Sequence, residues 1–568
     1  MKSEPTYRLA ESTVIEPLVN CWSAWSYLIA PAPASLHLLQ YQLSLLRSYV
    51  DNPKSHAAAG RESSLAGGAF INISTDRVSE VIALLESTKS NLSHNLDLAH
   101  SILDFQSWLT ANARGGGLAP CYQRIPKPLR GYVELVYDYF NRPSMRFFEN
   151  LLYKSHYYNA PLQSLRLFRL DRDGSRPFFL NTPRLLEKDQ IDWQAPFDVP
   201  EVDQLFMLDT RPRSLDSICQ ILGLNNQSRG SLLPMLTERP QTPPEKWKGN
   251  TVRVRYFGHA CLLIESQGIS ILTDPLISVR PAEGGLERFT FGDLPEDIDY
   301  ALITHNHRDH NCLETLLRLR HRIKCLVVPR SSGMLYGDIS LRLLFHRLGF
   351  RNVVEMDALE NLQLPDGEIT AVPFLGEHAD LAHGKTGYVI RLGKRKLLIG
   401  ADSDCLDKQV YENARRCVGR VDTVFLGTES VGAPLSWTYG PLLPQRPSRE
   451  DEESRRQRGC DARRAIDILE TLGASRFYNY GMGMEPWLEH ILGLGLSESS
   501  PQWLESEKLL AQARTRRFLE AERLYGKAEI ILENVDPAEE LFMPVTAPLQ
   551  NEKSHSIVAE DEFVFDLD

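Results

Sequence analysis

The chain has 568 residues, more than a single hydrophobic core normally holds, so we expect two or more domains. Apolar residues make up 42% and charged residues 24%, which is ordinary for a globular protein. A net charge of −11 argues against a nucleic-acid partner, because phosphate binding needs a basic surface. The sequence contains no run of about 18 apolar residues and no apolar centre of a signal peptide near its start, which argues against a membrane protein.

Nine cysteines are scattered along the chain without a CxxC pair. This pattern predicts reduced thiols in a cytoplasmic protein. It offers no cysteine-ligated zinc or iron–sulfur site.

The N-terminal part, residues 1–245, is predicted to form a mixed α/β domain. Residues 76–110 carry apolar residues at helical spacing and predict one or two helices, with Asp76 as the N-cap. The expected buried face contains Val78, Ile82, Leu85, Leu92, Leu96, Leu103 and Leu109. Further along, "SLRLFRL" and "RPFFLN" read as two strands joined by a turn at "DRDGSR".

The Pro-rich stretch "ERPQTPPEKWKGN", residues 238–250, marks a domain boundary. Beyond it, residues 250–535 contain short β-rich runs: "TVRVRYFGHACLLIES", "ISILTD", "YALITH", "KCLVVP", "GEITAVPFL", "TGYVIRLGKRKLLIGAD" and "VDTVFLGTES". A helical pattern, "NCLETLLRLRHR", follows the third run, and such alternation predicts layered α/β packing. Residues 445–464 read as a mobile insertion that then enters a helix, and the acidic residues 536–568 as a poorly packed tail.

The stretch "ALITHNHRDHNCLE", residues 301–314, concentrates metal-ligand side chains directly after an apolar run. In an extended backbone, residues i and i+2 point the same way, so His305 and His307 can chelate one ion together. The chain then turns, and Asp309 and His310 face a second position a short distance away. The HxHxDH spacing therefore predicts a two-metal site.

Bridging and closing ligands should come from other strand ends, because one loop cannot hold two adjacent ions alone. The candidates at such ends are Asp274, Glu377, His378, Asp402 and Glu429. We expect Asp402 to bridge the metals and Asp274 to hydrogen-bond a metal-bound histidine. His259, in "FGHA", is expected near the site at most.

With "TD" after an upstream strand and a strand-end Asp downstream, the HxHxDH motif resembles the metallo-β-lactamase superfamily over about residues 250–535. The resemblance implies an αββα sandwich with the metals at one edge of the two sheets, but it leaves the reaction open. Dizinc hydrolases of that superfamily use two further histidines. Here the first of those positions falls on Glu377 and His378, of which only one is expected to face the metals. For the second, His383, His490 and His555 remain, and none of them ends a predicted strand.

Two assignments therefore stay open. With Glu377, the donor set holds three imidazoles and three carboxylates, which favours iron over zinc. With His378 instead, the chain would be a zinc-dependent hydrolase acting on a lactone, phosphodiester or thioester through a metal-bound hydroxide.

Nearly the whole chain is similar to the diiron β-hydroxylases of nonribosomal peptide and antibiotic biosynthesis. The similarity rests on "THNHRDHNCLETLLRLRHR", "PFLGEHADLAHGKTGYVI", "IGADSD", "FLGTESVGAPLSWTYGPL" and "RGYVELVYDYFNRPSMRFFENLLYKSHYYN". It implies an oxo-bridged pair of iron ions with the ligands His305, His307, Asp309, His310, Glu377 and Asp402. It also implies a catalytic part for Glu377 and for Glu429, the latter as a carboxylate beside the metals.

The same resemblance implies a reaction and partners. The enzyme would use O2 to hydroxylate the β-carbon of an amino acid held as a thioester on the phosphopantetheine arm of a synthetase carrier domain. Because the sequence shows neither GxGxxG after a strand nor CxxC, the two electrons should come from a separate reductase or ferredoxin-like protein.

Two expectations concern the N-terminal domain and the surface. The family suggests that this domain forms a homodimer and helps to line a substrate channel beside the sandwich. Arg318, Arg320, Arg322 and Lys324 are either a docking patch for an acidic carrier domain or a solvated helix face.

Overall fold

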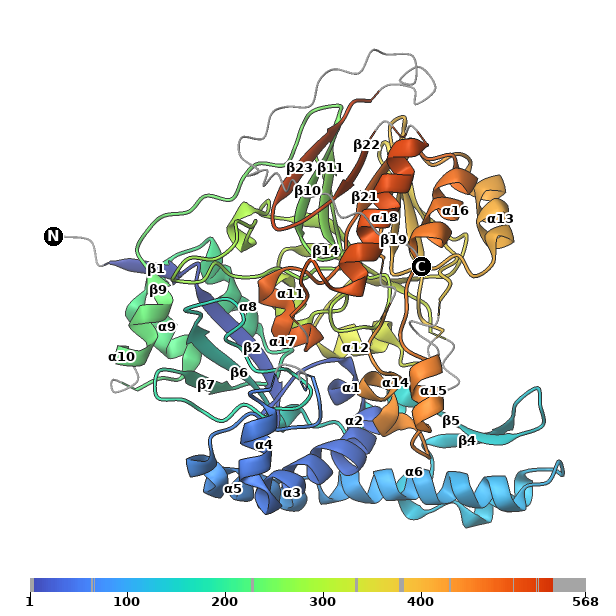
Figure 1. Cartoon of the computed structure of the whole chain (residues 1–568). Coiled ribbons are helices and arrows are strands. Elements are labelled where there is room, and N and C mark those ends of the chain that lie inside the picture. Colours follow the sequence, from blue (N-terminus) through green and yellow to red (C-terminus); the bar gives the residue numbers. More distant parts are fainter. Residues whose placement is uncertain are drawn as a thin grey trace, which may run out of the picture.

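The computed structural model describes residues 5–62, 65, 67–225, 229–331, 336–376, 383–428, 431–493, 495–516, 518 and 520–534. In the C-terminal half, two seven-stranded sheets stack face to face (Figure 1). The first has the order β15-β14-β13-β12-β11-β10-β23, and the second has the order β16-β17-β18-β19-β20-β21-β22. The predicted tail, residues 536–568, lies outside the described residues.

The strands of the first sheet are β10 (Val252–Gly258), β11 (Cys261–Ser266), β12 (Ile269–Thr273), β13 (Ile298–Leu302), β14 (Ile323–Pro329), β15 (Val353–Met356) and β23 (Ala528–Leu532). Those of the second are β16 (Asn361–Leu364), β17 (Gly367–Val372), β18 (Gly387–Leu392), β19 (Arg395–Ala401), β20 (Thr423–Leu426), β21 (Arg476–Asn479) and β22 (Glu520–Arg523). Every strand predicted in this half is present. Alternate apolar side chains of both sheets form the core between them, as period-2 patterning requires.

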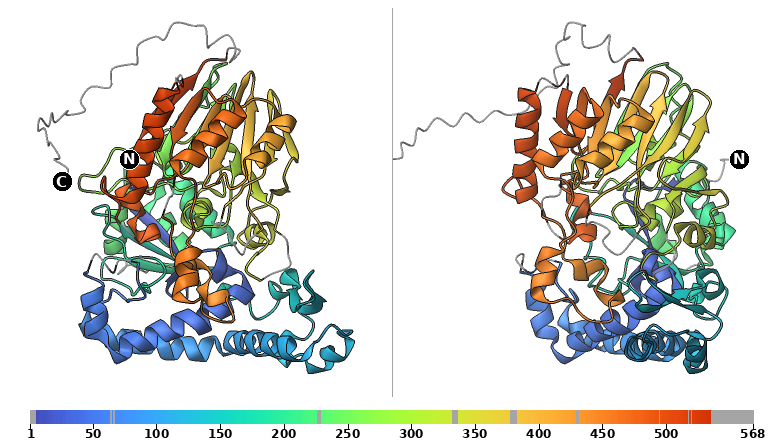
Figure 2. Two further views of the ribbon diagram at one scale, coloured as in Figure 1. Left: turned by 45° about the vertical axis from the view of Figure 1, so that its right-hand side comes forward. Right: turned by 90° about the vertical axis from the view of Figure 1, so that its right-hand side faces the viewer.

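Helices cover both outer faces, so the predicted αββα sandwich is confirmed. Helices α11 (Leu313–Leu319) and α12 (Leu341–Arg347) pack on the first sheet, in a core shared with the N-terminal half. Helices α13 (Lys408–Val418), α16 (Ala462–Leu472) and α18 (Pro501–Thr515) pack on the second, as Figure 2 shows from the side. Strands β12–β15 run parallel to one another, as do β19–β22, so their carboxyl ends gather at one edge of each sheet.

The N-terminal half is mixed α/β, as predicted. An antiparallel sheet has the order β3-β2-β6-β7, formed by β2 (Thr13–Val19), β3 (Trp22–Ser23), β6 (Gln163–Arg169) and β7 (Ile191–Gln194). A smaller sheet joins β1 (Thr6–Leu9) to β8 (Arg213–Ser214) and β9 (Leu236–Thr237). The main helices are α2 (Pro31–His37), α3 (Leu43–Asp51), α5 (Val78–Asn91), α6 (Ser93–Asn112), α8 (Pro200–Phe206) and α9 (Leu215–Leu222). A hairpin of β4 (Val133–Tyr137) and β5 (Pro143–Phe147) projects from the body (Figure 1).

Several local predictions need correction. Residues 76–110 do form two helices, and Leu85 is buried as predicted, but Ile82 is 42% exposed, because α5 buries Val81 and Leu84 beside Leu85. Asp76 lies in a short 3₁₀ turn before α5 and does not cap it. The run "RPFFLN" is not a strand, since β6 takes both its neighbours, β2 and β7, from elsewhere. Residues 445–464 enter α16 as predicted, but they also form the helix α15 (Arg449–Ser454).

Both interpretations of the basic run after residue 317 are wrong for its arginines. Arg318 is buried and donates to both carboxylate oxygens of Asp209, at 2.8 and 2.6 Å. Arg320 is buried against Asp203, and Arg322 donates to backbone carbonyls. These side chains therefore join α11 to neighbouring segments and present no basic face. Lys324 is exposed and pairs with Asp297 and Asp299.

None of the described helices has the length and apolar character needed to cross a bilayer. All nine cysteines lie in described residues, and none of them forms a disulfide.

The carboxyl group of Glu149, the first residue of the short helix α7 (Glu149–Leu152), makes the folding stability of the protein depend on pH. Burial, with the charges of Asp338 and Glu355, raises the pKa of Glu149 from 4.5 to about 7, although the Ser340 N–H donates to it. A carboxyl whose pKa is higher in the folded state binds its proton more tightly there, so stability falls as pH rises from 4.5 towards 7.

We therefore expect Glu149→Gln to be more stable than the parent by about 1–3 kcal/mol at pH 8 and to gain little at pH 4. Urea unfolding at both pH values measures the difference. Glu498→Gln, in an exposed loop, is the control and should change nothing at either pH. Equal stability of Glu149→Gln and its parent at pH 8 would contradict the assignment.

Candidate metal centre

The ends of three strands converge on the HxHxDH segment. β12 ends at Thr273, and the next residue, Asp274, has a positive φ of 37°. β19 ends at Ala401, with a φ of 45°, directly before Asp402. His259, in the turn between β10 and β11, has a φ of 52°. Non-glycine residues in this conformation are uncommon and cluster at functional sites.

The side chains of His305, His310 and Asp402 meet in the interior, each at most 3% exposed. Asp402 Oδ2 lies 2.9 Å from His310 Nε2 and 3.5 Å from His305 Nε2. The two imidazole rings are 4.2 Å apart between centroids. Asp402 thus faces histidines from both halves of the motif, the position that a bridging ligand requires.

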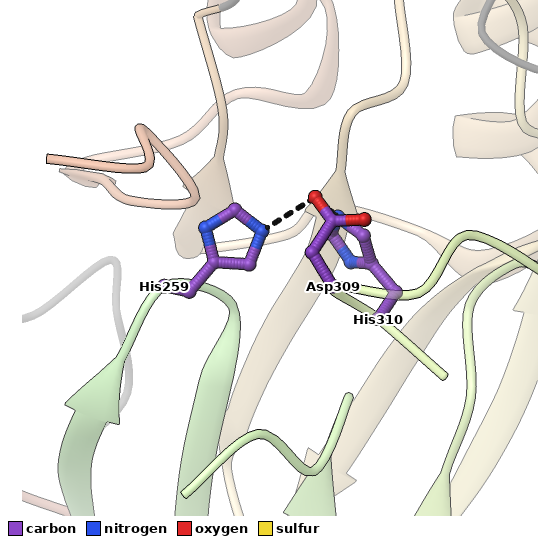
Figure 3. Close-up of side chains that lie close together, drawn as sticks. All are labelled: His259, Asp309 and His310. Atoms are coloured by element: carbon purple, nitrogen blue, oxygen red, sulfur yellow. Dashed lines mark hydrogen bonds and ion pairs between the residues drawn. The ribbon is translucent and has the colours of Figure 1, made fainter. Parts of the chain in front are cut away.

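Asp309 extends the group on the other side of His310. Its Oδ2 atom is 3.6 Å from His310 Nε2 and 3.0 Å from His259 Nε2 (Figure 3). His259, expected only near the site, is therefore in direct hydrogen-bonding contact with it. The ligand-type atoms of His259, Asp309 and His310 lie within 4.8 Å of one another, as do those of His305, His310 and Asp402. His307 is next to His305, with ring centroids 4.8 Å apart, and its Nε2 is 3.3 Å from the Tyr439 hydroxyl.

Asp274 fixes the segment in place. Its Oδ1 accepts from the Thr304 N–H at 2.8 Å, and its Oδ2 accepts from the Thr304 hydroxyl at 2.7 Å. The His310 Nδ1 lies 2.8 Å from the same Oδ2. The predicted hydrogen bond from a motif histidine to Asp274 is therefore present. It leaves the Nε2 lone pair of His310 facing Asp402 and Asp309, as metal binding requires.

The electrostatics favour a cation at this place. Burial would lower the pKa of His310, but the carboxylates of Asp402, Asp309 and Asp274 raise it well above its ordinary value. Burial would raise the pKa of Asp309, but the charge of His310 and the His259 hydrogen bond hold it below its ordinary value. Buried carboxylates that converge on imidazoles are a donor set for a metal ion, so the residues present fit a metal centre.

Two predicted residues, Glu377 and Glu429, lie outside the described residues, as does His378. The described neighbours of Glu377 approach the site: the Phe374 ring is 5.3 Å from that of His305, and Gly376 O accepts from Lys385 Nζ at 2.8 Å. β20, which precedes Glu429, runs parallel to β19 and ends beside Ala401.

The last histidine of the dizinc pattern is missing from the described strand ends. β21 ends at Asn479, and Gly481 follows in a left-handed conformation with its backbone near Asp402. His490 is buried in the short helix α17 (Glu489–Leu492), and His383 is exposed. Neither belongs to a cluster of converging ligand-type groups among the described residues.

Sequence reasoning missed two contacts of the motif. Tyr439, which reaches His307, is 132 positions away in the sequence. It lies in the stretch "FLGTESVGAPLSWTYGPL", but nothing in that stretch indicates this contact. Arg308, inside the motif, does not face the metals: it donates to Ser23 Oγ at 2.7 Å and lies over the Phe179 ring, with 4.2 Å from its Cζ to the ring centroid. A buried arginine between two proposed ligands indicates a contact with another part of the chain, but its partner can be identified only from the structure.

A buried cluster of imidazoles and carboxylates at the strand ends of an αββα sandwich defines a metal-dependent enzyme of the metallo-β-lactamase fold. Residues 253–429 match the family model of a β-lactamase superfamily domain, and residues 8–240 match that of the diiron non-heme β-hydroxylase N-terminal domain. The chain is 35% identical over 526 residues to the 4-amino-L-phenylalanyl-[CmlP-peptidyl-carrier-protein] 3-hydroxylase of Streptomyces venezuelae, covering 91% of this chain and 98% of that protein. The crystal structure of CmlA, a diiron β-hydroxylase from Streptomyces venezuelae, superposes with a TM-score of 0.86 at 35% identity, covering 93% of this chain and all of that chain.

The chain therefore belongs to the diiron β-hydroxylase family. The predicted family and fold are confirmed, and so is the predicted enzyme class, a monooxygenase with a dinuclear iron centre. The alternative, a zinc-dependent hydrolase, is not supported.

Proposed function

We propose that this chain is an O2-dependent diiron monooxygenase that hydroxylates the β-carbon of an amino acid tethered as a thioester to a synthetase carrier domain. The observation that carries the proposal is the group of His305, His310, Asp309 and Asp402, all buried except the partly exposed Asp309, which combines as many carboxylates as imidazoles. The relative that matches nearly the whole chain acts on an aminoacyl group bound to a peptidyl carrier protein.

In this proposal, His305, His307, Asp309, His310, Glu377 and Asp402 hold the two irons, and Glu429 is a carboxylate beside them. When bound, the two irons would supply the chemistry that activates O2, with two electrons from an external donor. Asp274 keeps the His310 Nε2 lone pair directed at the metals, and the near-complete burial of His305, His310 and Asp402 excludes bulk water from them.

The proposal also includes a division of the chain. Residues 1–245 would form the domain that helps to line the substrate channel, and residues 250–535 would form the catalytic domain. The hydrophobic core that α11 and α12 share with the N-terminal half supports a fixed relation between the two parts.

The test is mass spectrometry of aminoacyl-loaded carrier domains after incubation with iron-loaded enzyme, O2 and a chemical reductant. We expect one added oxygen atom on the aminoacyl group. If the reduced enzyme returns every loaded carrier unhydroxylated, the proposed reaction is wrong.

Glu377→His should shift the bound metal from iron towards zinc if Glu377 is a ligand, because imidazole suits zinc. Unchanged iron content in that variant would contradict the ligand assignment.

The proposal also covers the electron donor of the enzyme, its location in the cell and its oligomeric state. We propose an external reductase or ferredoxin-like donor, and a cytoplasmic location, which nine cysteines without a disulfide support. The projecting β4–β5 hairpin supports a homodimer, since Tyr139 and Phe140 at its tip are 105% and 80% exposed. Exposed aromatic residues of this kind usually mark an interface.

We expect Tyr139→Ser/Phe140→Ser to shift the protein from dimer to monomer in sedimentation-velocity experiments, with iron content unchanged. Leu504→Ser removes an exposed apolar side chain from α18 and serves as the matched control. A hairpin variant that sediments as the parent dimer would place the dimer contact elsewhere, and a monomeric parent would remove the dimer from the proposal.

A further inference from the structure

Two side chains of the N-terminal half reach into the HxHxDH motif. Ser23 Oγ accepts from Arg308 Nη2 at 2.7 Å. The Tyr27 hydroxyl hydrogen-bonds the side chain of Asn306. Asn306 and Arg308 are the residues on either side of His307 in the sequence. The N-terminal half therefore holds both neighbours of a proposed metal ligand.

Tyr27 is also connected to His307 itself, through Tyr439. The hydroxyl groups of the two tyrosines hydrogen-bond each other, and that of Tyr439 lies 3.3 Å from His307 Nε2. Both tyrosines are buried, at 0% and 1% exposure, and their ring centroids are 6.3 Å apart. Tyr27 belongs to the short helix α1 (Ser26–Ile29), and Tyr439 directly follows α14 (Leu435–Thr438), which lies near α1 in Figure 1. Parts of the chain that are distant in the sequence thus form one buried chain of hydrogen bonds that ends at His307.

The direction of these hydrogen bonds follows from the backbone carbonyl at the other end of the chain. Tyr27 donates its single hydroxyl hydrogen to Gly337 O at 2.6 Å, so its oxygen is left to accept from Tyr439. Tyr439 therefore points its hydrogen away from His307 and offers an oxygen lone pair to it. His307 Nε2 must carry a hydrogen to make this hydrogen bond, which places the lone pair of the neutral ring on Nδ1.

We propose that Tyr27 is a positioning residue of the metal centre, which acts through Tyr439 to keep His307 in the tautomer that presents Nδ1 to a metal. The inference deepens the proposed function, since it rests on the assignment of His307 as an iron ligand. Asp274 acts in the same way on His310 from within the sandwich, where it leaves the Nε2 lone pair for a metal. Tyr27 adds a contribution of the N-terminal half to iron binding, which the sandwich alone does not supply.

The first test compares the iron affinity of Tyr27→Phe and Tyr439→Phe, which keep the buried rings and remove one hydroxyl group each. We expect both variants to bind iron about 10-fold more weakly than the parent, because His307 loses its oriented acceptor. In Tyr27→Phe, the hydroxyl hydrogen of Tyr439 can turn towards His307 Nε2 and favour the wrong tautomer. Iron affinity equal to that of the parent in both variants would overturn the inference.

The matched control is Tyr49→Phe. Tyr49 is as buried as Tyr27, also belongs to the N-terminal half, and its hydroxyl donates to two backbone carbonyls at 3.1 and 3.0 Å. Its variant should lose as much thermal stability as Tyr27→Phe and keep the iron affinity of the parent. A loss of iron affinity in Tyr49→Phe equal to that in Tyr27→Phe would overturn the inference, because any buried tyrosine of this half would then have the same effect.

The double variant Tyr27→Phe/Tyr439→Phe tests whether Tyr27 acts through Tyr439. We expect it to bind iron no more weakly than Tyr439→Phe alone, because both losses fall on the same chain of hydrogen bonds. Losses of affinity that multiply in the double variant would show that the two tyrosines act separately and would overturn the inference.

The last test observes the metals directly and does not depend on turnover. In the Mössbauer spectra of iron-loaded Tyr27→Phe and Tyr439→Phe, we expect one iron to change and the other to stay as in the parent, since His307 binds one of them. Two unchanged irons in both variants would reduce the tyrosines to a role in stability and overturn the inference. If the spectra change as expected but no loaded carrier is hydroxylated, the proposed function fails and the positioning role of Tyr27 stands.

Discussion

Asp402→Ala should abolish both iron binding and hydroxylation. We expect iron to fall from two ions per chain to less than one, and kcat/KM to fall by about 10³-fold or more. The reason is the position of Asp402: its Oδ2 faces His310 at 2.9 Å and His305 at 3.5 Å. If Asp402 bridges the metals as proposed, its loss takes a donor from both metal positions at once. Metal analysis together with the near-ultraviolet spectrum of purified protein measures the first effect, and turnover of a loaded carrier measures the second.

The control for Asp402→Ala is Asp407→Ala, five residues along the chain. Asp407 is exposed and caps α13, accepting from the Gln409 N–H at 3.0 Å. Its loss should destabilise the protein by about 1 kcal/mol and leave iron content unchanged. Full iron content in Asp402→Ala would show that this aspartate is no ligand, whatever its effect on activity.

The sandwich could be predicted from the sequence because many of its strands carry two local sequence signals. The predicted runs are largely apolar, and several, such as "YALITH", end at a polar ligand-type residue; both features are local. β15, β16, β21, β22 and β23 were not predicted, because they are short or partly exposed and lack that contrast.

The wrong predictions of burial concern residues whose surroundings are formed by segments distant in the sequence. Arg318 looks like a surface residue in the sequence, yet it is 5% exposed because Asp209, 109 positions earlier, neutralises it. Ile82 looks like a core residue, yet α5 buries its neighbour Val81 together with Leu84 and the correctly predicted Leu85. Charge and spacing alone do not tell which segment lies opposite.

In the site, too, the predicted residues carry local sequence signals, whereas the unpredicted contact depends on how distant segments meet. His305, His307, Asp309 and His310 are recognisable together, because their spacing is fixed by one turn of the chain. Asp402 and Asp274 are recognisable as strand-end carboxylates, since parallel strands end at a common edge. The direct contact of His259 with Asp309 depends on the left-handed turn after β10, which no residue type in "FGHA" signals in advance.

Asp274→Asn should cost nearly as much as the loss of a ligand, although Asp274 is not proposed to touch a metal. The substitution keeps the shape of the side chain and removes its charge. An amide in place of the carboxylate can present N–H groups to His310 Nδ1, which now lies 2.8 Å from Oδ2. The imidazole would then carry its proton on Nε2, and the lone pair that faces Asp402 would be lost.

We therefore expect Asp274→Asn to bind iron about 10–100-fold more weakly and to lose activity in parallel, with activity partly restored at high iron concentration. The matched control is Asp422→Asn. Asp422 is an equally buried carboxylate that accepts from the Lys396 N–H at 2.7 Å, at the start of β19 and away from the metal ligands at its end. Both variants should lose stability, since each weakens a buried hydrogen-bond network, but only Asp274→Asn should release iron. Equal iron affinity in the two variants would show that Asp274 supports the fold alone and does not set the protonation of His310.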